Sequence, residues 1–315
     1  MILILKMLKG EEGLFRPLPP CCFSPHTEKR SLTMQVRALL VEAGRELTAA
    51  GVPDALLEAR VLAEYALGLN RVRLITEATR DVAQDTALRM RAAVARRASG
   101  EPLAHITGQR EFYGRPFRVT PHTLVPRPET ELLVEESLRR LPRGGCFADW
   151  GTGSGCVGIT LAAERPDCRG LLLDHSAEAL AVAWKNAREL GAEARLLPVR
   201  GDMLRPCLGR ARFDVICSNP PYIAPQEALD VMPEVRRHEP AQALFSEDNG
   251  LRHIRALIKS AGPALKPGGW LLLEHGAGQG AAVREALTQG NFAAIATQRD
   301  LAGQERCSLG QKLAL

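Results

Sequence analysis

The sequence lacks the patterns of several protein classes. Its eight cysteines include no Cys-x-x-Cys pair, and no two of its seven histidines stand four residues apart, so neither a disulfide scaffold nor a metal site is predicted. No apolar run approaches the length of a membrane span. The apolar first eight residues are broken by Lys6 and followed by Glu11 and Glu12, which excludes a secretory signal. We therefore expect a cytoplasmic protein with reduced thiols and no membrane contact.

Aromatic residues are also scarce. They make up 4% of the chain, and the N-terminal third shows no row of Lys or Arg interleaved with aromatics. Proteins that bind nucleic acids usually need a basic region of that kind, so direct nucleic-acid binding is not expected. The net charge of +5 is mild, and it permits an acidic or nucleic-acid-associated partner without requiring one.

The length of 315 residues permits two domains. Residues 1–33 contain Pro17, Pro19, Pro20 and Pro25 and are predicted to form a flexible leader, with Met34 as a possible natural start. The remaining boundaries follow from changes of pattern: residues 34–100 with helical periodicity, residues 101–126 as a connector with a β-hairpin around Gly114, and residues 127–315 with alternating helices and strands. Within residues 34–100, helices are expected from Val36 to about Leu47, at Ala55–Leu69 and at Gln84–Ala98. Alternation of this kind predicts an α/β fold with a doubly wound, mainly parallel sheet.

Asn219-Pro220-Pro221-Tyr222 follows an apolar run, residues 213–218, that predicts a buried strand. Two prolines cannot extend a strand, because each lacks an N–H and holds φ at about −65°. The rigid turn that results fixes two acceptors, the Asn219 side-chain oxygen and the Pro220 carbonyl, beside the ring of Tyr222. A planar amide or amino nitrogen could donate one hydrogen bond to each. Taken alone, the tetrapeptide is better explained as an ordinary strand-ending turn.

A glycine-rich loop lies about seventy residues upstream. Asp149-Trp150-Gly151-Thr152-Gly153-Ser154-Gly155 joins a short apolar strand to a predicted helix, and glycines there allow a sharp turn and close approach of a ligand. No Gly-Lys-Ser/Thr follows, which excludes a P-loop, and the G-x-G-x-G spacing differs from the dinucleotide fingerprint G-x-G-x-x-G. The loop therefore favours a nucleoside ligand without a pyrophosphate.

Acidic residues end the next two predicted strands. Asp174 suits hydrogen bonding to ribose hydroxyls, although it could instead cap the following helix, a role that Ser176 could also take. Asp202 could accept a hydrogen bond from an adenine amino group or could serve a turn. Because the carboxyl ends of parallel strands meet at one edge of a sheet, we expect the glycine loop, Asp174, Asp202 and Asn219 to surround one ligand.

This order of features resembles the class I S-adenosylmethionine-dependent methyltransferases. More narrowly, it resembles the PrmC/HemK family, the peptide chain release factor N5-glutamine methyltransferases. The resemblance covers about residue 34 to the C-terminus. Besides the glycine loop and the tetrapeptide, it rests on less general segments: residues 101–108 with 110–113, 127–131, 238–240 with 243–244, 271–276, and 299–300 with 305–306.

The resemblance implies a Rossmann-like sheet with one antiparallel strand and a small N-terminal helical domain that binds the substrate protein. It implies that Asn219, Pro220 and Tyr222 are catalytic, and that Pro221 and Arg127 also contact the substrate. The implied contacts of S-adenosylmethionine are Asp149, Gly151, Thr152, Gly153, Ser154, Gly155, Asp174, Asp202, Met203 and Asn219. The implied reaction methylates the side-chain amide nitrogen of the glutamine in the Gly-Gly-Gln loop of release factors, by a monomeric enzyme without a metal.

Two other functions remain open from the sequence. The tetrapeptide is shared with adenine-modifying methyltransferases, so N6 methylation of a flipped adenine in DNA or RNA is the main alternative. The missing basic region disfavours it. A non-enzymatic binding module on the same fold is the second alternative, and the intact loop and tetrapeptide disfavour that one.

Overall fold

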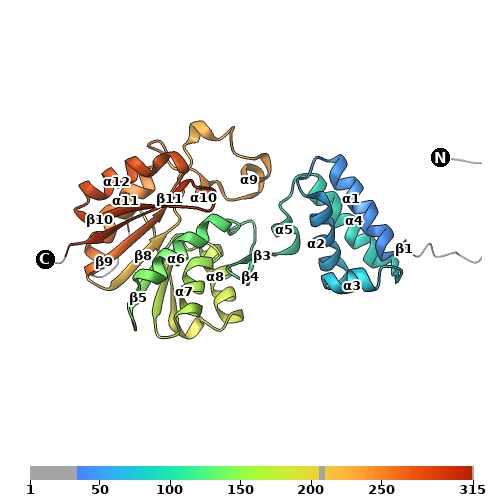
Figure 1. The fold of residues 1–315 in the computed structure, drawn as a ribbon, viewed down its shortest axis with the longest axis horizontal. Coiled ribbons are helices and arrows are strands. Elements are labelled where there is room, and N and C mark those ends of the chain that lie inside the picture. The colour runs from blue at the N-terminus through green and yellow to red at the C-terminus, as the bar shows by residue number, and fades with distance from the viewer. Residues whose placement is uncertain (1–33, 206–209, 314–315) are drawn as a thin grey trace, which may run out of the picture.

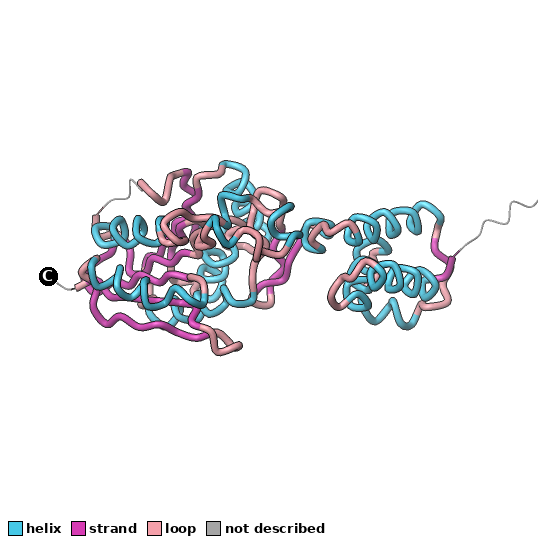
Figure 2. The backbone as a smooth tube through the Cα atoms, turned by 90° about the horizontal axis from the view of Figure 1, so that it is seen from above, coloured by secondary structure: helices cyan, strands magenta, loops and turns pink. Residues whose placement is uncertain are grey.

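The computed structural model describes residues 34–205 and 210–313, so the predicted leader lies outside the described residues. Within this part of the chain, a small helical domain and a larger α/β domain lie side by side (Figures 1 and 2). Each has its own apolar core. None of the helices that the structure describes is long and apolar enough to cross a membrane.

The N-terminal domain is helical, as predicted. The three predicted helices are present, and the sequence patterns missed a short fourth one and a two-residue strand pair. Asn70 caps the short helix by accepting a hydrogen bond from the backbone N–H of Arg73. The elements are β1 (Met34–Gln35), α1 (Val36–Ala49), α2 (Ala55–Leu67), α3 (Arg71–Thr76), β2 (Asp81–Val82) and α4 (Gln84–Ala98).

A short helix and the predicted hairpin connect the two domains. They are α5 (Leu103–Thr107), β3 (Gln109–Phe112) and β4 (Arg115–Arg118). Tyr113 and Gly114 form the two-residue turn, both with positive φ. The Asn186 side chain bonds the backbone N–H and carbonyl of Arg118 and also donates to the Ser154 carbonyl. The hairpin is thereby attached to the glycine loop.

The α/β domain is built on a seven-stranded sheet in the order β10-β11-β9-β8-β5-β6-β7. The pairs among β5 to β9 are parallel, whereas β11 runs antiparallel to both of its neighbours, β9 and β10. The predicted mainly parallel sheet with one antiparallel strand is confirmed. The strands are β5 (Cys146–Trp150), β6 (Arg169–Asp174), β7 (Leu196–Arg200), β8 (Phe213–Ser218), β9 (Leu265–Glu274), β10 (Phe292–Arg299) and β11 (Glu305–Lys312).

Helices cover both faces of the sheet (Figure 1). Successive strand residues point to opposite faces, so Phe147 packs into one apolar cluster and Ala148 into the other. One face is covered by α6 (Glu131–Arg140), α7 (Cys156–Glu164) and α8 (Ala177–Glu189), and the other by α11 (Arg252–Ala264) and α12 (Gly280–Gln289). Two short helices follow β8 in the chain, α9 (Pro233–His238) and α10 (Ala241–Leu244).

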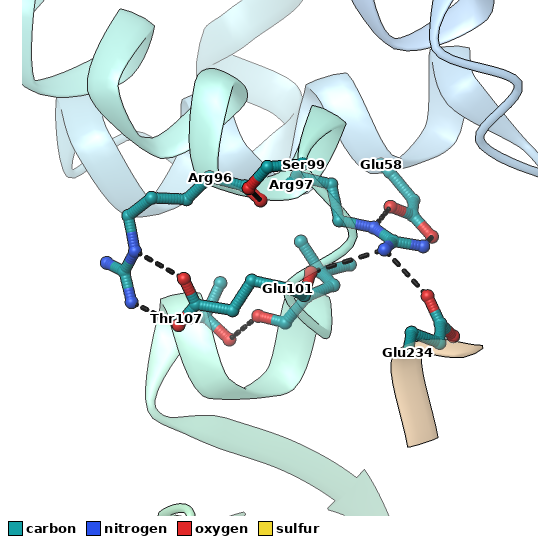
Figure 3. Close-up of polar contacts among 8 residues, drawn as sticks. Glu58, Arg96, Arg97, Ser99, Glu101, Thr107 and Glu234 are labelled. Carbon is teal, nitrogen blue, oxygen red and sulfur yellow. Dashed lines mark hydrogen bonds and ion pairs between the residues drawn. The ribbon is translucent and has the colours of Figure 1, made fainter. Parts of the chain in front are cut away.

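One buried arginine joins the two domains (Figure 3). Arg97, in the last turn of α4, is 4% exposed and pairs with Glu58 of α2 and with Glu234 of α9. Its Nη1 lies 2.7 Å from the Glu234 carboxylate and also donates to the Glu101 carbonyl at 3.2 Å. Since α9 belongs to the α/β domain, this guanidinium helps to fix how the two domains meet.

Arg97→Ala should lower the free energy of unfolding by about 3 kcal/mol, because it leaves two carboxylates without their cation. This is the low end of the effect for buried pairs, since both glutamates keep some contact with water. Denaturant titration measures the change. Arg89→Ala is the matched control: Arg89 is 61% exposed in its pair with Asp85, and its loss should cost less than about 0.5 kcal/mol. Equal losses for the two variants would contradict a special role for Arg97.

Candidate active site

A cavity opens at the carboxyl edge of the sheet, with about 770 Å³ of empty space including its mouth. It is lined by ten of the residues predicted from the sequence: Arg127, Asp149, Gly151, Thr152, Gly153, Ser154, Asp174, Met203, Asn219 and Pro221. Gly155, Pro220 and Tyr222 lie beside this lining rather than in it, and Asp202 lines an adjoining cavity. The lining also contains residues without a predicted role: His122, Thr123, Thr130, His175, Pro240 and Gln242.

Asp149 holds the glycine loop in shape. Its buried Oδ2 accepts from the Thr152 hydroxyl at 2.7 Å and from the Gly158 N–H at 2.9 Å. Burial raises the pKa of the carboxyl to about 6, although these two hydrogen bonds act in the opposite direction. The backbone N–H groups of Gly151 and Thr152 both donate to the Leu173 carbonyl, which ties the loop to the end of β6.

Asp174 ends β6 with its carboxylate at the cavity. One oxygen accepts from the Gly153 N–H at 2.9 Å, and the other accepts from the Ser176 N–H at 3.0 Å. The helix cap is Ser176, whose hydroxyl accepts from the Ala179 N–H at 3.0 Å. Asp174 is therefore not needed as the cap of α8. A carboxylate has about four acceptor positions, so lone pairs remain for a ligand's hydroxyl groups.

Asp202 and Met203 follow β7 and differ in what they do. Asp202 is exposed and accepts from the Leu204 N–H at 2.8 Å, which is the turn role left open by the sequence. Met203 lies across the glycine loop, because a Cβ added to Gly151 would come within 2.5 Å of the Met203 methyl carbon. The thioether side chain thus borders the cavity on the β7 side.

The tetrapeptide turn leaves β8 next to this cavity. Pro220 and Pro221 are buried, and Asn219 and Tyr222 are partly exposed. Asn219 donates from its side-chain nitrogen to the Thr130 hydroxyl at 3.1 Å. Within the described part of the chain, no hydrogen bond uses the Asn219 side-chain oxygen or the Pro220 carbonyl. Neither predicted acceptor is thus engaged by a described residue; Asn219 lines the cavity, whereas Pro220 is buried beside it.

A glutamine holds the far end of the turn. Gln279 donates from Nε2 to the Tyr222 carbonyl at 2.9 Å and to the Asn249 carbonyl at 3.1 Å. Its Oε1 accepts from the Gly276 N–H at 2.9 Å. Burial raises the pKa of the Tyr222 phenol, and the nearby Glu274 carboxyl adds to this, so the phenol is neutral around pH 7.

Arg127, the predicted substrate contact, is engaged in an ion pair. Its Nη2 lies 2.6 Å from Oε1 of Glu239, whose other oxygen accepts from the Val125 N–H at 3.1 Å. Arg127 also lines the cavity and is partly exposed. The pair holds the chain entering α6 against the segment after α9.

Sequence reasoning gave no role to several polar residues around the turn. Thr130, Glu239 and Glu274 lie in segments that were noted only for a family resemblance, and Gln279 was not singled out. That resemblance was the available signal. The structure brings these residues to Asn219, Arg127 and Tyr222 from distant parts of the chain, so spacing alone carries no trace of the contacts.

Comparisons with known proteins identify the family of the chain. The family models of the PrmC N-terminal domain and of the methyltransferase small domain match residues 38–108 and 128–245. The release factor glutamine methyltransferase of Nitratidesulfovibrio vulgaris is 44% identical over 274 residues, 86% of this chain and 93% of that protein. That of Escherichia coli strain K12 is 38% identical over 279 residues, 88% of this chain and 99% of that protein. A methyltransferase structure from Pyrococcus furiosus is 19% identical, with a TM-score of 0.48, and covers 64% of this chain and 91% of that one.

The seven-stranded sheet, the glycine loop after β5 and the acidic residue ending β6 define the fold of an S-adenosylmethionine-dependent methyltransferase. The relatives share 38–44% identity along more than four fifths of the chain. The chain belongs to the family of release factor glutamine methyltransferases.

Two glycines of the loop should respond differently to alanine. Both have positive φ, which costs an alanine about 1–2 kcal/mol. A Cβ at Gly155 would also lie 2.5 Å from the Ile159 side chain and 3.1 Å from Ala183, whereas a Cβ at Gly153 meets nothing within 4 Å. Gly155→Ala should therefore destabilise the fold by an additional ~1–3 kcal/mol. Gly153→Ala should mainly weaken binding of S-adenosylmethionine.

Denaturant titration and calorimetry with S-adenosylmethionine separate the two effects. The prediction is wrong if the Gly153→Ala protein binds the cofactor normally and is less stable than the Gly155→Ala protein.

Proposed function

We propose that this enzyme transfers the methyl group of S-adenosylmethionine to the side-chain amide nitrogen, N5, of the glutamine in the Gly-Gly-Gln loop of peptide chain release factors. The observation that carries the proposal is the pair of uncommitted acceptors at the end of β8, beside the cavity, in a chain with release factor glutamine methyltransferases as relatives. Methylation of that glutamine would modulate translation termination.

Residues of the cavity suit the chemistry of the cofactor. Gly153 has open space where a side chain would stand, and the Asp174 carboxylate retains acceptor capacity for ribose hydroxyls. Gly151, Thr152, Ser154 and Gly155 would shape the loop around the methionine part, with Asp149 beneath, while Met203 and Asp202 would flank the adenine. When bound, S-adenosylmethionine supplies a methyl group on a positively charged sulfur that is ready to be displaced. The proposal includes no metal.

The chain's own residues act on the accepting nitrogen. An amide nitrogen is a poor nucleophile, because its lone pair is shared with the carbonyl. If Asn219 and Pro220 each accept a hydrogen bond from one of its two N–H groups, they fix the orientation of the nitrogen and increase its electron density. Positive charge that develops on the nitrogen then faces two oxygen dipoles and the ring of Tyr222. Pro221 keeps the turn rigid.

No dedicated base is needed for the transfer. The nitrogen becomes more acidic as it gains the methyl group, so its proton leaves to water afterwards. Neutral acceptors suit a neutral substrate, since an aspartate at position 219 would carry a charge that requires pairing or solvation in a closed site.

The N-terminal domain, residues 34–100, is proposed to dock the release factor. Several of its large apolar side chains are more than half exposed and could contact a protein partner; they include Leu56, Leu57, Val72, Ile75 and Leu88. The connector, residues 101–126, and Arg127 would lie between that surface and the turn.

Asn219→Ala should reduce methyl transfer by on the order of 100-fold or more, because one of the two groups that hold the nitrogen is lost. Mass spectrometry of a release factor, incubated with enzyme and S-adenosylmethionine, follows one added methyl on the loop glutamine. Calorimetry should find the cofactor still bound. Full turnover by this variant would show that Asn219 does not hold the nitrogen. A methyl group found only on DNA or tRNA in parallel assays would show that the release factor is not the substrate.

Asp174→Ala should weaken binding of S-adenosylmethionine by roughly 10- to 150-fold, which corresponds to the ~1.5–3 kcal/mol of a hydrogen bond to a charged group. Calorimetry measures the affinity. Asp167→Ala is the matched control, because Asp167 precedes the opposite end of the same strand and accepts from the Gly144 N–H. If both variants bind the cofactor equally well, the ribose contact is wrongly assigned.

A further inference from the structure

Three consecutive residues of the loop ahead of α11 have left-handed backbone angles. Asp248, Asn249 and Gly250 have φ values of 58°, 51° and 81°. Glycine adopts this conformation freely, but it costs energy at the other two positions and persists only where surrounding contacts hold it. Strained segments of this kind gather at functional sites, so the contacts of the loop of residues 248–250 indicate what it supports.

The loop lies directly against Tyr222. A Cβ added to Gly250 would collide with the Tyr222 carbonyl oxygen and would lie 2.5 Å from Nε2 of Gln279. Ile223, the residue after Tyr222, accepts at its carbonyl from the Ser246 N–H at 2.8 Å, just ahead of the loop. The end of the tetrapeptide turn and the loop are thus in backbone contact, at a distance that only a glycine at position 250 permits.

Gln279 joins the loop to Tyr222. Its Nε2 donates to the carbonyls of Tyr222 and Asn249, at 2.9 and 3.1 Å, and its Oε1 accepts from the Gly276 N–H at 2.9 Å. A carbonyl can only accept and an N–H can only donate, so these three partners fix which end of the amide faces which neighbour. Both N–H groups of the amide are used, and a reversed amide would lose all three hydrogen bonds.

A helix cap explains only one of these contacts. Gln279 ends the short helical turn Ala277–Gln279 ahead of α12, and Gly276 precedes that turn. A glutamine at this position commonly accepts from the N–H at the start of the turn. The two donated hydrogen bonds serve no cap, because they reach residues that lie 57 and 30 positions away in the chain.

The ring of Tyr222 rests on the same support. A Cβ added to Gly276 would lie 3.7 Å from Cδ2 of the ring and 3.2 Å from Oε1 of Gln279. The ring also packs against the apolar cluster that α11 and α12 form with the sheet. Gln279 is not among the described residues that line the cavity, so it reaches the site through Tyr222.

We propose that Gln279 is a positioning residue for methyl transfer: it holds the main chain of Tyr222 against the loop of residues 248–250 and thereby fixes the Tyr222 ring beside the accepting nitrogen. The inference rests on the role given to Tyr222 in the proposed function. It assigns to Gln279 no contact with the substrate or the cofactor.

The first test is Gln279→Glu. A carboxylate still accepts from the Gly276 N–H, and its charge suits a helix N-terminus, so the cap is kept. It cannot donate, however, and it repels the carbonyls of Tyr222 and Asn249. The kcat for methylation of a release factor should fall on the order of 10- to 100-fold, since a displacement of about 1 Å can cost 100-fold. The KM for the release factor and the affinity for S-adenosylmethionine should stay within about twofold.

Gln311→Glu is the matched control. Gln311 of β11 also donates from Nε2 to a carbonyl, that of Gly268 at 2.9 Å, near the opposite end of β9. This variant should keep its kcat within about twofold of the wild type. A wild-type kcat for Gln279→Glu, which a cap alone predicts, overturns the proposal. So do equal losses for the two variants, or a raised KM at unchanged kcat.

The second test changes the loop and adds no charge. Gly250→Ala places a methyl group where the Tyr222 carbonyl lies, so it should lower kcat by a similar factor. Gly144→Ala is the matched control: Gly144 has a φ of 65° in the turn before β5, at the opposite edge of the sheet, and a Cβ there meets nothing within 4 Å. It carries the same backbone strain without the displacement, and it should keep the rate.

Thermal denaturation of each variant gives the fraction that is folded at the assay temperature. Equal rates for Gly250→Ala and Gly144→Ala overturn the proposal. A loss of rate in Gln279→Glu or Gly250→Ala that disappears once the rate is divided by the folded fraction also overturns it, because the residue then serves stability alone.

The outcomes distinguish this inference from the proposed function. If the wild-type enzyme adds no methyl group to a release factor, the proposed function is wrong, and the positioning role falls with it. If the wild type methylates the release factor and Tyr222→Ala does not, while Gln279→Glu and Gly250→Ala are fully active, the positioning role alone is overturned.

Discussion

The site depends on the inability of two consecutive prolines to continue a strand. Pro220 and Pro221 force the chain to leave β8 in a rigid turn, and both are buried. The turn is then attached at its two ends, to Thr130 at Asn219 and to Gln279 at the Tyr222 carbonyl. Attachment at both ends leaves little freedom to the two proposed acceptors, so the entropic cost of ordering them is met on folding rather than on binding.

The sheet order explains why these attachments converge. Strands β8 and β9 are neighbours, and β5 pairs with β8 on the other side, so their carboxyl ends bring Glu274, Asn219 and the glycine loop to one edge. The chain reverses its direction of winding between β5 and β8, which is where open α/β sheets bind their ligands. The neighbouring α9 carries Glu234, through which the N-terminal domain reaches the same region by way of Arg97. One segment of the α/β domain, residues 233–239, thus contacts both the N-terminal domain, at Arg97, and the cavity residue Arg127.

Much of this could be predicted from the sequence, because it depends on local physics. Apolar runs ending in Gly, Asp or Pro marked the strands from β5 to β8, and Ser176 was recognisable as a cap. The missed elements include α3, which is too short for a clear period, the β1–β2 pair, where two residues carry no pattern, and the short helices α5, α9 and α10. The contacts that hold the turn were also missed, since Thr130 and Asn219 lie 89 residues apart, and Gln279 and Tyr222 lie 57 apart. A polar residue's partner at such distances is decided by topology.

The distribution of charge around the turn follows from the substrate. The groups proposed to bind the amide are neutral, Asn219 and the Pro220 carbonyl, and the carboxyl of Glu274 is buried at the end of the neighbouring strand β9. A carboxylate in direct contact would have to lose its hydration when a neutral substrate closes the site, and it would attract cations in place of an amide.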